Sequence, residues 1–382
     1  MYHRVGVTPK DQSALRFVWR TPGNDEPLRT LQMTTQHAVN SNSQFPAVAK
    51  KLVDNFYADN LSESFETEEE AILFSKQAVK SLASRGFRLT AFASSSRRLL
   101  ASIPASERSN KSLNLDFDKL PIEYLLGLVW VCDVDCYRIR IRPMEMATSK
   151  RQMLSAMSRT FDPLGILLPV ITQAKILFQA TWRTTQERVP ARKSGSRLEA
   201  LGWDETLPDG ILLKWKSWSK ELPLLEKISI PRCFRTADLP LKDSQFELHL
   251  FSDASSDAFG AVAYLRTIAK GKIHLSFVLA KGRLAPLKLH SIPHLELQGA
   301  VTAVRLAKTI KSELRLPIAE YYFWTDSEIV LRWIHSSHCN YSSFVSHRVA
   351  EILRHQNQNN GDSYPDQKIP PTTAREECPP PS

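Results

Sequence analysis

The feature that most constrains this chain is an acidic residue at the end of an alternating apolar run. The run Glu247–Ser252 has Leu248 and Leu250 on one face. It ends at Asp253, and a polar turn then leads to a second apolar run, Phe259–Tyr264. Because side chains alternate between the two faces of a strand, this pattern predicts two adjacent strands with a carboxylate at the rim of their sheet.

Two further acids lie in comparable settings downstream. Pro293 suits the first turn of a helix, so Glu296 falls within about one turn of the start of the long helical pattern that follows. Gly299 would let the backbone of that helix approach the sheet closely. Asp326 closes the apolar run Tyr321–Trp324. The sequence thus predicts carboxylates at the edges of three separate elements.

Carboxylates on separate elements are the ligands that a two-metal nuclease needs to hold Mg²⁺ against a phosphodiester. The structural alternative makes Asp253 a turn residue, Glu296 a first-turn acid and Asp326 the N-cap of a helix over 327–334. Each residue taken alone favours this alternative. Taken together with their flanking motifs, the three residues favour the metal site.

The composition is that of an ordinary globular protein with a basic excess. The 382 residues are enough for two or three domains, and 50 basic residues against 40 acidic residues give a net charge of +10, which suits a polyanionic partner. Five cysteines at scattered positions predict a reducing, intracellular environment. Because no apolar run approaches the roughly 20 residues of a membrane span, no membrane partner is expected.

The pattern along the chain predicts a mixed α/β protein in four parts. Residues 1–145 mix strands and helices, 146–240 are helical, and 241–355 alternate strands and helices. Residues 356–382 are rich in Gln, Asn, Pro and charge and are predicted to be a disordered tail, since they cannot bury enough apolar surface to order themselves. Helices are predicted over 67–84, 149–159, 166–182 and 212–225, the first of them opened by a capping box of Thr67 and Glu70.

Six short motifs in one order give these patterns a common interpretation. They are Met1–Val5, Phe56–Asn60, Phe161–Gly165, Phe251–Ser255, Ile292–Gln298 and Trp324–Ser327. With them the chain resembles the reverse transcriptase–ribonuclease H region of BEL/Pao-type retrotransposon polyproteins. The resemblance implies a partial reverse-transcriptase palm over 1–145, a helical thumb and connection over 146–240, and a ribonuclease H-like domain over 241–355.

The polymerase part departs from the family pattern. The family uses one acid just upstream of the segment that resembles Met1–Val5, and an Asp-Asp pair in its Phe-Tyr-x-Asp-Asp box. Here the sequence begins after the position expected for the upstream acid, and the pair reads Asp59-Asn60. Asn60 carries no charge to hold a metal ion, so reverse transcriptase activity is expected to be absent, and the hairpin is expected to serve folding alone.

The ribonuclease H part also departs from its family. Such domains close with a further strand and a helix that bears a fourth acid, and the surroundings of Asp362 and Asp366 do not resemble that motif. The domain is therefore expected to be C-terminally truncated and its two-metal Mg²⁺ site incomplete. A zinc site at His335, His338 and Cys339 is not favoured, because no second ligand pair accompanies these residues.

The function implied by the resemblance is Mg²⁺-dependent cleavage of RNA in RNA–DNA hybrids, with Asp253, Glu296 and Asp326 as catalytic metal ligands. Lys281, Arg283 and Lys288 are expected between the third strand and its helix. They would contact the phosphate backbone there, although a solvated loop explains them equally well. The alternative is a catalytically inert retroelement relic that at most binds nucleic acid. The implied partners are an RNA–DNA hybrid or another nucleic acid, and other parts of a retroelement polyprotein.

Overall fold

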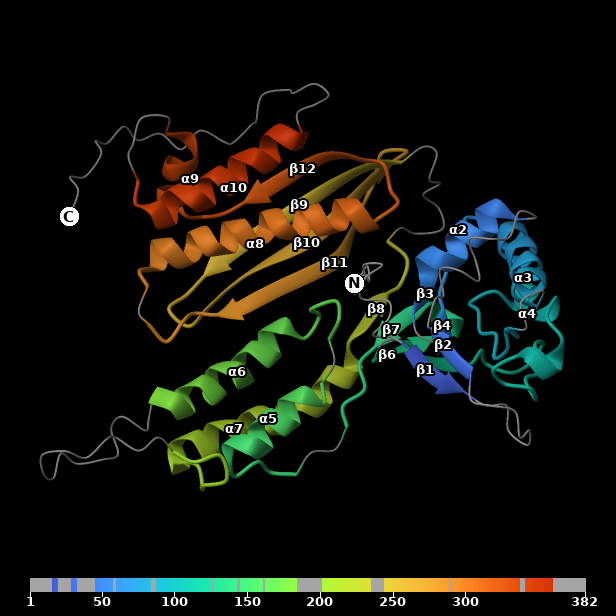
Figure 1. Ribbon diagram of the computed structural model, residues 1–382, viewed down its shortest axis with the longest axis horizontal. Coiled ribbons are helices and arrows are strands. Elements are labelled where there is room, and N and C mark those ends of the chain that lie inside the picture. The colour runs from blue at the N-terminus through green and yellow to red at the C-terminus, as the bar shows by residue number, and fades with distance from the viewer. Residues whose placement is uncertain are drawn as a thin grey trace, which may run out of the picture. The chain divides into compact units, whose positions relative to one another are not determined.

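The described residues of the computed structural model are 16–19, 29–32, 45–57, 60–83, 87–125, 127–142, 145–160, 162–183, 201–234, 244–288, 290–336 and 341–359. The chain is mixed α/β, as predicted (Figure 1). It divides into two compact units. The first comprises Met1–His249, Tyr264–Ala280 and Leu316–Glu320, and the second comprises Leu250–Ala263, Lys281–Arg315 and Tyr321–Ser382. No helix in these described ranges is long and apolar enough to span a membrane.

The N-terminal part of the first unit contains short strands and helices. They are β1 (Arg16–Trp19), β2 (Arg29–Gln32), α2 (Pro46–Asn55), β3 (Phe56–Tyr57), β4 (Asn60–Leu61), α3 (Glu68–Ala83), α4 (Arg97–Ala101), β5 (Ile122–Leu125), β6 (Leu128–Val131) and β7 (Cys136–Arg138). Strand β3 pairs antiparallel with β4, which confirms the predicted hairpin. Residues 1–15, including the Met1–Val5 motif, lie outside the described ranges.

Helix α3 begins where the capping box predicts. The hydroxyl of Thr67 accepts a hydrogen bond from the Glu70 backbone N–H at 3.2 Å. On this helix Phe74, Ala78 and Leu82 are buried in a cluster with α2, whereas Leu73 and Val79 are exposed. Phe56 of β3 and Leu61 of β4 pack against the same cluster.

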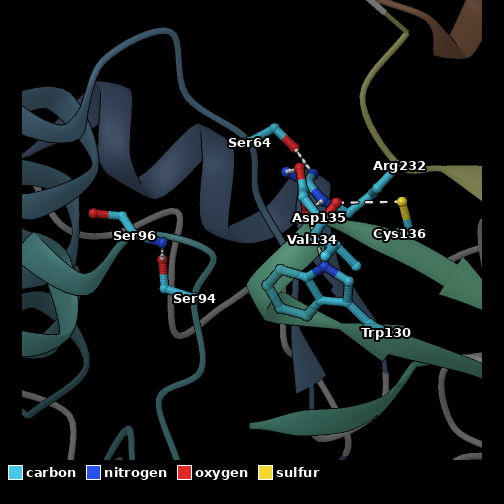
Figure 2. A network of polar contacts seen from close by, with 8 residues as sticks. All are labelled: Ser64, Ser94, Ser96, Trp130, Val134, Asp135, Cys136 and Arg232. Atoms are coloured by element: carbon cyan, nitrogen blue, oxygen red, sulfur yellow. Dashed lines mark hydrogen bonds and ion pairs between the residues drawn. The ribbon is translucent and has the colours of Figure 1, made fainter. Parts of the chain in front are cut away.

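An ion pair fastens β8 (Ser229–Pro231) to the turn between β6 and β7 (Figure 2). The Arg232 guanidinium donates to both carboxylate oxygens of Asp135 at 2.6 and 2.9 Å, and to the Ser64 hydroxyl at 2.7 Å. The Trp130 indole N–H donates to the same carboxylate at 2.9 Å. Asp135 has a φ of 48°, in the left-handed region that Asp and Asn tolerate best among residues with side chains. One carboxylate therefore holds three segments of the chain together.

Replacing Asp135 with Asn is expected to destabilise the first unit by about 2 kcal/mol, because it leaves a mostly buried guanidinium without its charged partner. Asn keeps the left-handed backbone accessible, so the change reports on the ion pair. Urea unfolding of the full chain measures it. The matched control is Asp204→Asn, which removes an equally bidentate but exposed partner of Arg151 and should change stability far less. Equal effects of the two substitutions would contradict the assignment.

The helical part of the first unit consists of α5 (Lys150–Ser158), α6 (Leu168–Arg183) and α7 (Asp209–Glu221). Ser149 caps α5, accepting from the Gln152 N–H, as the predicted start implies. Trp215 and Trp218 of α7 are buried in the core of this part, with ring centroids 4.6 Å apart. Helix α6 packs by one side against this core, and its Trp182 is 37% exposed.

The turn before α6 contacts strand β11 (Lys272–Leu284) within the first unit. Both carboxylate oxygens of Asp162 accept backbone N–H groups, from Ile166 at 2.9 Å and Leu167 at 2.7 Å. Burial raises the pKa of Asp162, although these hydrogen bonds oppose the effect. The Leu164 carbonyl accepts from the Ala280 N–H at 2.9 Å. Gly165 has a φ of +76°, and an added Cβ would lie 2.2 Å from the Ala280 carbonyl oxygen, so only glycine fits this contact.

The C-terminal sheet has the strand order β11-β10-β9-β12, with β9 (Gln245–Ala254), β10 (Ala258–Ala269) and β12 (Ile318–Trp324). Lys270 and Gly271 join β10 to β11 with φ values of 50° and 74°, the positive values that a two-residue hairpin turn requires. Helix α8 (Ile292–Glu313) lies along the strands in Figure 1, beside α10 (Ser343–Asn359). An added Cβ on Gly299 would lie 3.2 Å from the Asp253 carbonyl oxygen, which confirms the close approach predicted for this glycine.

Helices α9 (Glu328–His335) and α10 pack on α8 around a core that includes Leu297, Val301, Val330, Val345 and Val349. Helix α10 continues to Asn359, into the segment predicted to be a disordered tail. Residues 360–382, with Asp362 and Asp366, lie outside the described ranges.

Candidate active site

Asp253 is the second-last residue of β9, and its side chain is exposed. Leu248, Leu250 and Ser252 are buried on one face of the strand, so alternation directs Asp253 to the other face, at the rim. One carboxylate oxygen accepts the Ala254 backbone N–H at 2.6 Å. Strand β9 therefore positions this acid as the sequence predicts.

Glu296 lies in the second turn of α8 and is half-buried. Its carboxylate accepts a hydrogen bond from the hydroxyl of Ser327, which directly follows Asp326. Ser327 is 7% exposed and also accepts the Val330 N–H at 3.3 Å. One buried hydroxyl thus joins the start of α8 to the segment that leaves β12.

Asp326 follows β12 and is exposed. It is not the N-cap of the following helix, because Ser327 occupies that position and α9 starts at Glu328. Asp and Ser are equally good caps, so the dipeptide alone could not decide between them. The Asp326 carboxylate therefore does not cap α9, which was the structural role considered as the alternative to metal binding.

The ends of β9 and β12 meet at one end of the sheet. The Ser252 hydroxyl donates to the Trp324 carbonyl at 3.4 Å. Together with the hydrogen bond between Ser327 and Glu296, this contact brings the elements that carry the three acids together. Within the described part of the chain, however, no three His, Cys, Asp or Glu side chains are grouped closely enough to hold a metal ion. Carboxylate oxygens are the ligands that Mg²⁺ prefers, but the three carboxylates lie too far apart in this structure to bind one ion together.

The basic residues do not lie where the sequence suggested. Lys281 and Arg283 belong to β11 itself, which runs to Leu284, and only Lys288 follows the strand. All three are exposed. The strand is longer than its local pattern indicates because pairing with β10 extends it: an added Cβ on Gly260 would lie 3.1 Å from the Lys281 carbonyl oxygen. The basic end of β11 therefore lies at the same end of the sheet as Asp253, two strand spacings or roughly 10 Å away.

One histidine, His294, borders the site on α8. Burial, and then the neighbouring His290 and Arg348, lower the pKa of His294, which stands on α8 two residues before Glu296. His294 packs against the rings of Trp333 and Phe344. Because a lowered pKa keeps this imidazole neutral near pH 7, it leaves the negative charge of the carboxylates undiminished.

The other predicted sites are only partly described. Asn60 is exposed in β4, and Asp59 lies outside the described ranges, so the absence of polymerase activity stays a prediction. His335 ends α9, while His338 and Cys339 lie outside the described ranges. The sequence reasoning missed Ser327 as the link to Glu296. Its only signal was a small hydroxyl residue directly after a strand-end acid.

No curated protein matches the sequence. The ribonuclease H1 of the halophilic archaeon Halobacterium salinarum NRC-1 aligns with 10% identity over 29% of this chain and 77% of its own, with a TM-score of 0.21. The foamy viral protease-reverse transcriptase in complex with an RNA/DNA hybrid aligns with 14% identity over 97% of this chain and 44% of its own, with a TM-score of 0.44. This chain thus spans less than half the length of that foamy viral protein.

The family described as "Pao retrotransposon-like RNaseH-like domain" matches residues 149–327. The match starts at the N-cap of α5 and ends at the N-cap of α9, so it contains Asp253, Glu296 and Asp326. It confirms the resemblance to Pao-type retrotransposons that the motifs indicated. Over residues 149–327 this chain is therefore similar to the Pao retrotransposon-like RNaseH-like domain family.

Proposed function

We propose that the chain cleaves the RNA strand of RNA–DNA hybrids in the presence of Mg²⁺, with Asp253, Glu296 and Asp326 as the acidic residues of the site. The observation that supports this proposal best is the pair of hydrogen bonds from Ser252 and Ser327, which tie β9, β12 and α8 together where the acids lie. The match to an RNaseH-like family over the same residues supports it as well.

Each residue has a distinct part in the proposal. Exposed Asp253 and Asp326 are accessible to a phosphodiester and would hold the cation together with Glu296. Ser327 orients Glu296 by its hydrogen bond. Bound Mg²⁺ would supply activation of a water and stabilisation of the leaving oxygen. The exposed cations of Lys281 and Arg283 would attract the phosphate backbone toward this end of the sheet.

The test is cleavage of a hybrid with a labelled RNA strand by the full chain across a Mg²⁺ titration. The expected products are RNA fragments with the DNA strand intact, and the same RNA in single-stranded form should remain uncut. A folded chain that leaves the hybrid intact at every Mg²⁺ concentration would overturn the proposal.

A second candidate function is nucleic-acid binding without cleavage. The open spacing of the acids in the described part of the chain favours it. The two candidates differ in one measurement, because both predict binding of the hybrid and only the first predicts Mg²⁺-dependent fragments.

Binding to nucleic acid is expected to weaken steeply with salt, because phosphate contacts release condensed counterions. Lys281→Ala should lower the slope of log affinity against log salt by about one, and the same change at Arg283 should act alike. Lys216→Ala, which removes an exposed lysine of α7, is the matched control and should leave the slope unchanged. Equal slopes for all three variants and the unmodified chain would show that β11 does not contact the backbone.

A further inference from the structure

A cluster of positive charge lies where α8 packs against α10. Arg305 of α8 donates to both carboxylate oxygens of Glu351 on α10, at 2.7 and 2.9 Å. Lys308 follows Arg305 by three residues on α8, and Arg348 precedes Glu351 by three residues on α10. Because residues three apart on a helix are neighbours on its surface, three cations surround one carboxylate.

The single carboxylate does not balance these cations. The hydrogen bond and the charge of Arg305 lower the pKa of Glu351, although burial opposes them, and the charges of Arg348 and Lys308 act in the same direction as Arg305. Burial, and then the charge of Arg305, lower the pKa of Arg348. Among the described groups, Glu351 is the only acid that opposes this effect. The ionised cluster therefore carries a net charge of about +2.

Arg348 is held in one orientation. Its guanidinium carbon lies 3.4 Å from the ring centroid of Phe344, and its Nη1 group donates to the Phe344 backbone carbonyl at 3.0 Å. Within the described part of the chain, its Nε and Nη2 groups donate no hydrogen bond. Two donors on one fixed plane match two oxygens of a phosphate group, and a fixed side chain loses little entropy when it binds.

The other two cations are accessible. Lys308 is exposed, and so is Arg305, which uses its Nε and Nη2 groups for Glu351 and keeps Nη1 on its outer side. The cluster thus offers a planar guanidinium, the remaining donor of a second one, and a mobile ammonium group. This set of donors fits an anion with several oxygens.

The cluster lies apart from the acids of the proposed site. Arg305 follows Glu296 by nine residues of α8, which corresponds to roughly 14 Å along the helix axis. Nine residues are also about two and a half turns, so the two side chains leave opposite sides of the helix. A phosphate group bound at the cluster is therefore not one that the acids hold.

We propose that Arg305, Lys308 and Arg348 bind the phosphate backbone of a nucleic-acid segment that lies outside the acidic site. Charge complementarity supports this ligand, because each nucleotide carries one negative charge on oxygens that accept from guanidinium and ammonium groups. The net charge of +10 would attract such a polyanion to the chain. The inference shares with the proposed function only that nucleic acid is the ligand, and it does not depend on cleavage.

The salt dependence of binding tests the inference. The full chain is titrated with a labelled RNA–DNA hybrid and with single-stranded RNA, without divalent cations so that no RNA is cut. Lys308→Gln and Arg348→Gln should each lower the slope of log affinity against log salt by about one, for at least one of the two ligands. The control is Arg332→Gln on α9, an exposed arginine that also has its own carboxylate partner, and its slope should not change.

Glu351→Gln separates ligand binding from a purely structural role. Gln keeps the size of the side chain and an oxygen that can accept from Arg305, but it removes the negative charge that competes with phosphate. This variant should therefore bind nucleic acid several-fold more tightly at low salt. An affinity that stays the same or falls would overturn the inference, because it would show that the network serves only to join α8 to α10.

Chemical footprinting of the unmodified chain covers the case in which a variant fails to fold. Bound nucleic acid should protect Lys308 from acetylation and leave Lys216 of α7 reactive. Lys308 that stays reactive, unchanged slopes for both glutamine variants, or protection by vesicles of acidic phospholipid in place of nucleic acid would each overturn the inference. Lowered slopes in a folded chain that never cleaves the hybrid would refute the proposed function and leave this inference standing.

Discussion

Asp253→Asn is expected to lower the rate of hybrid cleavage by at least about 1,000-fold and to leave the chain folded. A metal-ion site stabilises the charge of the transition state by several kcal/mol, and each 1.4 kcal/mol corresponds to a factor of about ten. Asn keeps the size of the side chain and removes its charge. Because Asp253 is exposed and its one described hydrogen bond is to the adjacent Ala254, the substitution should cost little stability. Asp326→Asn should act alike.

The control is Asp257→Asn, which removes one negative charge in the turn just after Asp253. Its backbone carbonyl accepts the Ala285 N–H at 2.8 Å, a contact that the substitution retains. This variant should cleave at nearly the original rate. Single-turnover cleavage of the labelled hybrid, with circular dichroism of each variant, makes the comparison. Cleavage that survives at both Asp253 and Asp326 would point to a contaminant or to another site.

Gly165→Ala is expected to destabilise the first unit by about 3 kcal/mol or more. A side chain at a φ of +76° is strained, and its Cβ would meet the Ala280 carbonyl oxygen at 2.2 Å. The backbone would have to move away from β11, so the hydrogen bond from Ala280 to Leu164 would be lost as well. Chemical denaturation of the full chain measures the change.

Two other glycines separate the causes. Gly271 has a φ of +74° with nothing within 4 Å of an added Cβ, so Gly271→Ala should cost only the backbone strain, about 1–2 kcal/mol. Gly210 in α7 has open space and an ordinary φ, so Gly210→Ala should be neutral or slightly stabilising. If Gly165→Ala lowered the free energy of unfolding no more than Gly271→Ala does, the close approach to Ala280 would not contribute to stability.

Local patterns predicted the elements that carry the acids. Alternation in β9 identified the strand before Asp253, and Pro293 marked the start of the helix that carries Glu296. Both patterns involve residues that are close in the sequence, so they can be recognised without knowledge of the tertiary structure. The close approach of Gly299 was predictable for the same reason, since only glycine leaves room for a backbone neighbour.

The remaining features depend on contacts between distant residues. Lys281 and Arg283 lie in β11 because pairing with β10 extends that strand, and no local signal marks where pairing ends. The role of Ser327 depends on Glu296, 31 residues away. Glu247 was expected only as part of an alternating strand. In the structure it is buried beside Arg266 and His249. Arg266 is distant in the sequence, so the local pattern could not predict this contact.

The strand order of the C-terminal sheet sets the sequence of events in folding. Strands β9, β10 and β11 follow one another through short turns, so they can pair early with little loss of loop entropy. Strand β12 joins β9 only across a connection that contains the 22 residues of α8, and such distant pairings form slowly. Because Asp326 arrives with β12, a growing polypeptide would hold a formed three-stranded meander before its set of acids is complete.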